Sequence, residues 1–99
     1  MKKNETSPLA DNSYYWIGEA YYAKKDYQQA SVHFLKGYQK FPKGQKAPDN
    51  LLKLSMSLAG LDKQKEACTT LEKLSQEFPK MPTSVRQKAD AERTKLSCK

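Results

Sequence analysis

The sequence predicts an all-α protein, and three observations lead to this expectation. Apolar residues recur at the three- and four-residue spacing of an amphipathic helix in four successive stretches. Residues that start or stop helices separate these stretches. The chain also repeats itself, because a shift of 37 residues places residues 36–43 on residues 73–80 with five identities. Its 99 residues are enough for a single small domain.

The first repeat unit spans residues 11–44 and contains two predicted helices. The leading helix has an apolar stripe that begins at Tyr14 and continues to Tyr21. The second helix is expected to start at Asp26, because Asp is a preferred N-cap residue. Pro42 ends it, since a proline inside a helix removes a hydrogen bond and clashes with the preceding turn.

The second unit spans residues 48–81 and follows the same plan. Pro48 is suited to the first turn of a helix. Gly60 predicts the end of that helix, and Asp62 is the predicted N-cap of the next one. Both units should bury one apolar stripe in a shared core. The predicted core consists of Tyr14, Ile17, Tyr21, Tyr27, Phe34, Tyr38, Leu54, Leu58, Leu71 and Phe78.

The ends of the chain differ from the units between them. Residues 83–96 predict a fifth helix of low apolar content, which is typical of a helix that caps the end of a repeat array. Residues 1–10 are polar and show no helical period, so we expect a disordered tail or the remnant of a linker. The folded domain is therefore predicted to cover residues 11–97.

Charge and residue counts exclude several classes of function. The net charge is +7, yet of the 18 basic residues only Arg86 and Arg93 are arginines, and the lysines are spread along the chain. This pattern favours a solvated surface over a nucleic-acid site, where arginine predominates. No apolar run is long enough to span a membrane. Two cysteines and one histidine make no zinc site, and we expect no metal, no cofactor and no enzymatic activity. Cys68 and Cys98 are compatible with two buried thiols or with one disulfide.

The repeat unit resembles the tetratricopeptide repeat. That repeat pairs two antiparallel helices, with small residues where the helices cross and a proline after the second helix. The matching residues are Gly18, Ala30 and Pro42 in the first unit and Ser55, Ala67 and Pro79 in the second. The resemblance implies a solenoid of two helix-turn-helix repeats plus a C-terminal capping helix, which serves as a surface for docking proteins or peptides.

Two further stretches resemble a narrower family. Residues 15–22 read Tyr-Trp-Ile-Gly-Glu-Ala-Tyr-Tyr, and residues 46–54 read Lys-Ala-Pro-Asp-Asn-Leu-Leu-Lys-Leu. Both are similar to the C-terminal repeat domain of the Tol-Pal associated family YbgF, also called the cell division coordinator CpoB. This resemblance implies a periplasmic adaptor that contacts TolA. Such an adaptor coordinates outer-membrane constriction with the septal peptidoglycan synthesis machinery during cell division.

The same resemblance bears on oligomerisation and on the cysteines. Full-length members of that family trimerise through an N-terminal coiled coil that these 99 residues do not contain, so trimerisation is not assigned to this domain. The oxidising periplasm favours a disulfide between Cys68 and Cys98. Either the tail after Leu96 would have to fold back or the last helix would have to cross at an angle to bring them together, because Cys98 overshoots Cys68 along antiparallel helices. The alternatives are a generic peptide-binding repeat adaptor outside the Tol-Pal system and a docking domain cut from a larger enzyme.

The resemblance also implies a binding groove. In such repeats the groove is lined by the first helix of each unit, at its second, fifth, ninth and twelfth positions. We expect Tyr15, Tyr22, Leu52 and Met56 to be partly exposed there and to contact a partner, since aromatic and methionine side chains are frequent interface anchors. The predicted groove residues are Asn12, Tyr15, Glu19, Tyr22, Asp49, Leu52 and Met56.

Overall fold

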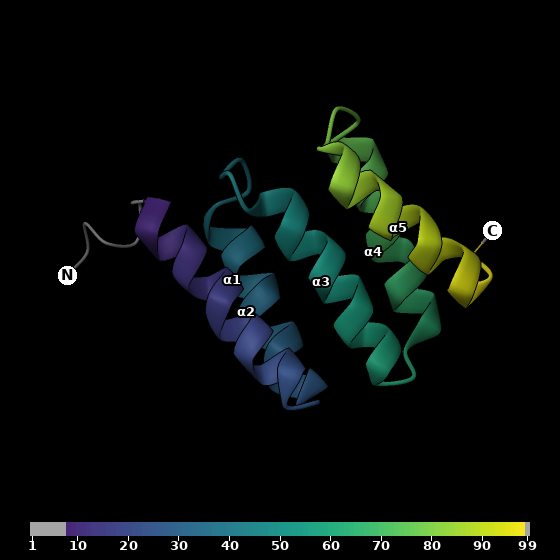
Figure 1. The fold of residues 1–99 in the computed structure, drawn as a ribbon, viewed down its shortest axis with the longest axis horizontal. Coiled ribbons are helices and arrows are strands. Elements are labelled where there is room, and N and C mark those ends of the chain that lie inside the picture. The colour runs from purple at the N-terminus through teal and green to yellow at the C-terminus, as the bar shows by residue number, and fades with distance from the viewer. Residues whose placement is uncertain (1–7, 99) are drawn as a thin grey trace.

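The computed structural model describes residues 8–98, and within them the chain is all-α, as predicted. Helices α1 and α2 form the first unit, α3 and α4 form the second, and α5 follows as the capping helix (Figure 1). The breaks between successive helices fall at the predicted positions. The helices are α1 (Pro8–Ala23), α2 (Tyr27–Lys40), α3 (Ala47–Gly60), α4 (Gln64–Glu77) and α5 (Thr83–Leu96).

Helix α3 is the centre of the fold and contacts all four other helices. In Figure 1, α1 lies in front of α2 and α5 lies in front of α4, with α3 between the two pairs. The first helices of the units, α1 and α3, therefore form one layer with α5, and α2 and α4 form the other. We call the exposed surface of the α1/α3/α5 layer the inner face. No described helix is both long and apolar enough to cross a membrane.

The core lies along α3 and the helices that pack against it, and it includes fully buried Phe34, Leu71 and Leu74. Gly18 makes room for Phe34, because a Cβ on this glycine would lie 2.6 Å from the Cε1 atom of the ring. The prediction that Ile17 belongs to the core is wrong, since Ile17 is 43% exposed. Its repeat equivalent Leu54 is buried against α2, whereas no described helix occupies the corresponding side of α1.

The turns inside the two units share a backbone conformation but not a cap. Lys25 and Asp62, which stand 37 residues apart, both have a φ of 63°. The prediction for Asp26 is confirmed, because its Oδ1 accepts a hydrogen bond of 3.2 Å from the backbone N–H of Gln29. The prediction for Asp62 is wrong. Lys63 is the N-cap of α4, and its side chain offers no acceptor to the helix.

Gly60 ends α3 as predicted, although its φ is not positive. A Cβ at this position would lie 2.6 Å from Cδ2 of Tyr27. Gly60 is therefore required by close packing of α3 on the start of α2.

The C-terminal segment folds back onto α4. Ser97 adopts a left-handed conformation with a φ of 57°, and the backbone N–H of Cys98 donates to the carbonyl of Arg93 at 3.0 Å. This reversal after the last helical turn brings the Cα atoms of Cys68 and Cys98 within 5.5 Å, and the two residues form a disulfide. The predicted fold-back after Leu96 is confirmed.

The predicted tail of residues 1–10 falls mostly outside the described residues. Its last three residues belong to α1, which begins at Pro8 rather than at residue 11.

Candidate functional site

The predicted groove residues lie on the inner face, with one correction. Asn12, Tyr15, Glu19 and Tyr22 are on α1, and Asp49 and Met56 are on α3; all six are partly exposed.

Leu52 is the exception, because it is only 3% exposed. It belongs to the same buried cluster as Val85 and Ala89 of α5. The capping helix packs on α3 and covers this position, so the accessible part of the predicted groove lies toward α1.

A chain of polar contacts connects α1 to α3. The hydroxyl of Tyr15 donates to Oε2 of Glu19 at 3.1 Å. The other carboxylate oxygen, Oε1, lies 3.1 Å from Nζ of Lys53. The side chains of this ion pair are only 16% and 26% exposed for Lys53 and Glu19, so solvent screens it less than a surface pair. These contacts hold Tyr15 and Glu19 in one orientation.

The same lysine also contacts the second tyrosine. Nζ of Lys53 lies 4.7 Å from the centroid of the Tyr22 ring, within range of a cation–π interaction. Tyr22 meets the ring of Tyr27 edge-on, with centroids 5.3 Å apart. Lys53 therefore joins the contacts of Tyr15 to those of Tyr22 in a single network.

A second lysine approaches from the loop before α3. Nζ of Lys46 lies 4.7 Å from the Tyr15 ring centroid and 5.6 Å from that of Trp16. Trp16 meets Tyr15 edge-on and is 60% exposed. We use the name tyrosine–lysine cluster for Tyr15, Glu19, Tyr22, Lys46 and Lys53, with Trp16 as its exposed neighbour.

Burial and nearby charges disfavour ionisation of both tyrosine hydroxyls. The pKa of Tyr15 is raised by burial and, to a smaller extent, by the negative charges of Glu19 and Asp49. Burial also raises the pKa of Tyr22, with smaller contributions from Tyr27 and Glu92. Both tyrosines, which are neutral at physiological pH in any case, therefore resist ionisation at alkaline pH as well. The cluster offers rigid aromatic surface bordered by fixed cations, which is suited to docking a protein segment.

Sequence reasoning did not assign Lys46 or Lys53 to the groove. The repeat itself offered an indication for Lys53. This lysine stands 37 residues after Trp16, so it occupies the equivalent position in the second unit, next to a predicted groove residue. No local pattern indicates that a lysine in the loop before α3 reaches two rings on α1, since that contact depends on how α1 and α3 are placed.

Comparison with known families agrees with this architecture. The tetratricopeptide repeat family matches residues 12–43 and 49–80, which together make up more than half of the chain. The chain therefore belongs to the tetratricopeptide repeat family, whose domains serve as protein-interaction modules. No curated protein matches the sequence.

Proposed function

We propose that this domain is a non-enzymatic, periplasmic adaptor of the Tol-Pal system, similar to the YbgF family, and that it takes part in cell division. In this role it contacts TolA and connects outer-membrane constriction to septal peptidoglycan synthesis. The observation that carries the proposal is the tyrosine–lysine cluster. Tyr15, Trp16, Glu19 and Tyr22 all fall within residues 15–22, the stretch whose sequence resembles that family.

The geometry of the cluster explains how it could hold a partner. Trp16 is the most exposed large apolar side chain among the described residues, and it stands beside the half-buried ring of Tyr15. Burying such a side chain in a partner's pocket removes apolar surface from water. The contacts of Lys46 and Lys53 already restrain the neighbouring tyrosines, so less side-chain entropy is lost on binding.

The disulfide supports the proposed compartment. Disulfides persist in the oxidising bacterial periplasm and are rare in the reducing cytosol. The bond between Cys68 and Cys98 ties the end of the chain to α4.

The direct test is titration of purified TolA with this domain by calorimetry. Trp16→Ala and Met56→Ala should each weaken binding, and a hot-spot residue would reduce affinity about tenfold or more. Tyr38→Phe is the control, because the Tyr38 hydroxyl contacts Glu77 of α4 and not the inner face. Thermal melts of each variant separate lost affinity from lost stability.

Two results would contradict the proposal. If TolA does not bind, the Tol-Pal assignment fails and the generic repeat adaptor becomes the better description. If TolA binds and neither inner-face variant affects its affinity, the cluster is not the docking site. Thiol titration of protein isolated from the periplasm tests the compartment, since the bonded pair leaves no thiol to react.

A further inference from the structure

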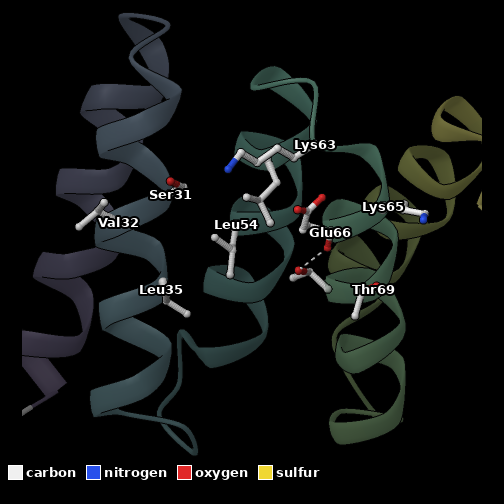
Figure 2. A pocket seen from close by; sticks show the side chains of 10 residues that line it. Ser31, Val32, Leu35, Leu54, Lys63, Lys65, Glu66 and Thr69 are labelled. Carbon is white, nitrogen blue, oxygen red and sulfur yellow. Dashed lines mark hydrogen bonds between the residues drawn. The ribbon is translucent and has the colours of Figure 1, made fainter.

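A second surface lies on the side of α3 away from the inner face. A groove of about 480 Å³ runs between α2 and α4, with α3 as its floor (Figure 2). We call it the outer groove. Its lining residues from α2 and α3 are Ser31, Val32, Leu35, Leu54 and Leu58, and those from the start of α4 and the residue before it are Lys63, Lys65, Glu66, Thr69 and Thr70.

The outer groove has an apolar centre that is open to solvent. Leu54 on the floor is buried, whereas Leu58 beside it is partly exposed. Leu35 is 39% exposed, and Figure 2 shows it directed from α2 toward α3. Apart from Trp16 and Ile17 on α1, it is the only large apolar side chain exposed to this degree among residues 12–98, whose side chains the structure describes.

Repeat packing does not explain the apolar wall formed by α2. The residues that stand 37 positions after Val32 and Leu35 are Thr69 and Glu72, both polar and exposed. Leu35 is 39% exposed even though the second unit packs on the first through α3. The stacking of the two units therefore leaves part of this apolar wall uncovered.

The chain itself shows what can cover such a surface. Ser31 in the outer groove corresponds to Cys68 in the second unit, and Cys68 is bonded to Cys98 of the C-terminal segment. Leu96 of the same segment packs against the core. A short segment that carries an aliphatic side chain therefore lies beside the equivalent position of α4, although Thr69 and Glu72 remain exposed.

Charge indicates which kind of segment suits the outer groove. Lys63 reaches across one end of the groove toward α2 (Figure 2) and forms no ion pair with any described residue. Lys65 extends away from α2, and Glu66 is the one acidic residue of the lining. The net charge of +7 disfavours a second copy of this chain and attracts acidic segments.

We propose that the outer groove binds a short segment of another protein in which aliphatic side chains are interspersed with acidic residues. An aliphatic side chain of the partner packs between Leu35 and Leu58, and a neighbouring carboxylate lies at Lys63. This site is separate from the tyrosine–lysine cluster. With one surface on each side of α3, the domain can hold two partners at once.

The test uses a fluorescein-labelled synthetic peptide of alternating leucine and glutamate, and a matched peptide with glutamine in place of glutamate. Fluorescence anisotropy measures binding to the full 99-residue chain. Leu35→Gln should weaken binding of the acidic peptide about tenfold, because it removes a partly exposed apolar contact without opening the core. Lys63→Glu should weaken binding of the acidic peptide about threefold at low salt. The glutamine peptide should bind the wild-type chain about threefold more weakly than the acidic peptide does.

Control variants separate the outer groove from the rest of the surface. Trp16→Ala alters the inner face, and Lys43→Glu makes the same charge change as Lys63→Glu at an exposed loop position. Both should leave the affinity for the acidic peptide within about twofold, which is small beside the effect of losing a hot-spot contact. Amide shifts in ¹H–¹⁵N spectra should concentrate on α2 and the start of α4.

Four outcomes would overturn the proposal. The acidic peptide fails to bind at millimolar concentration, or Leu35→Gln leaves its affinity unchanged. The glutamine peptide binds as tightly as the acidic one. Sedimentation shows that the chain self-associates and that Leu35→Gln abolishes the association, in which case a second copy occupies the groove. None of these results bears on TolA binding at the inner face, so the two proposals can fail independently.

Discussion

The two repeat units fill equivalent positions in the core with different pairs of side chains. In the first unit Gly18 lies against Phe34, and in the second the corresponding residues are Ser55 and Leu71. Phe34, Ser55 and Leu71 are all fully buried. A larger side chain on one helix is matched by a smaller one on its partner, so the helix pair keeps its spacing. The repeat conserves the volume between its helices and not the residue types.

The units also differ in what covers them. Tyr15 and Leu52 occupy the same repeat position, yet Tyr15 is partly exposed and Leu52 is buried beneath α5. Position in the repeat determines which face a residue belongs to. The neighbouring helix determines whether that face is accessible. The first unit therefore carries most of the accessible inner face, and the second unit carries the disulfide that holds the C-terminal segment.

The largest expected effect on stability comes from removing the disulfide of the second unit. Cys98→Ser should lower the free energy of unfolding by about 3–4 kcal/mol, because the disulfide closes a loop of 30 residues and limits the unfolded chain. Urea denaturation measures the change. Reductant should lower the midpoint of the wild-type protein and leave that of the variant unaltered. A wild-type midpoint that does not respond to reductant would show that α5 is held by its packing alone.

The next effect tests the matched volumes in the core. Gly18→Ser should destabilise the domain by roughly 1–3 kcal/mol, because the new Cβ would lie 2.6 Å from Cε1 of Phe34. Adding Phe34→Leu reproduces the pair found in the second unit and should recover part of the loss. The double-mutant cycle should give a coupling of about 0.5–3 kcal/mol. Strictly additive changes would mean that the two positions do not share one packing site.

A smaller effect on stability is expected at the N-caps of α2 and α4, which differ between the two units. Asp26→Ala should cost about 1 kcal/mol, because it removes the acceptor for the N–H of Gln29. Lys63→Asp should stabilise the domain by a similar amount, since α4 has no side-chain cap. Urea midpoints of both variants provide the comparison. If Lys63→Asp lowers the midpoint, repulsion from nearby Glu66 outweighs the new cap.

The smallest effect concerns alkaline pH and the two tyrosines of the inner face. The pKa values of Tyr15 and Tyr22 are raised in the folded protein, chiefly by burial. Above a pH of about 10 the unfolded chain loses these phenolic protons while the folded protein keeps them, so stability should fall as the pH rises. Tyr15→Phe should make the urea midpoint less sensitive between pH values of about 9 and 11. An unchanged pH profile would show that the hydroxyl of Tyr15 does not contribute to this dependence.

The residues that could be placed from sequence are those whose contacts lie within one helix or one turn. The helix breaks at Pro42 and Pro79 and the cap at Asp26 follow from local chemistry, and they were predicted correctly. The predicted cap at Asp62 was wrong, because a left-handed residue in the turn shifts the N-cap to Lys63. The resemblance to the tetratricopeptide repeat assigned the predicted groove residues to the first helix of each unit, and six of the seven are partly exposed there.

The sequence by itself determined the helices, their order and the repeat, because helical periodicity, capping and proline all act over a few residues. Only the tertiary structure decided which faces stay open. Ile17 is exposed, Leu52 is covered by α5, and Lys53 bridges Glu19 and Tyr22. These outcomes depend on which helix lies alongside, and burial is set by neighbours that are distant in sequence. The outer groove has the same origin, because residues of α2, α3 and α4 form it only once the helices have packed.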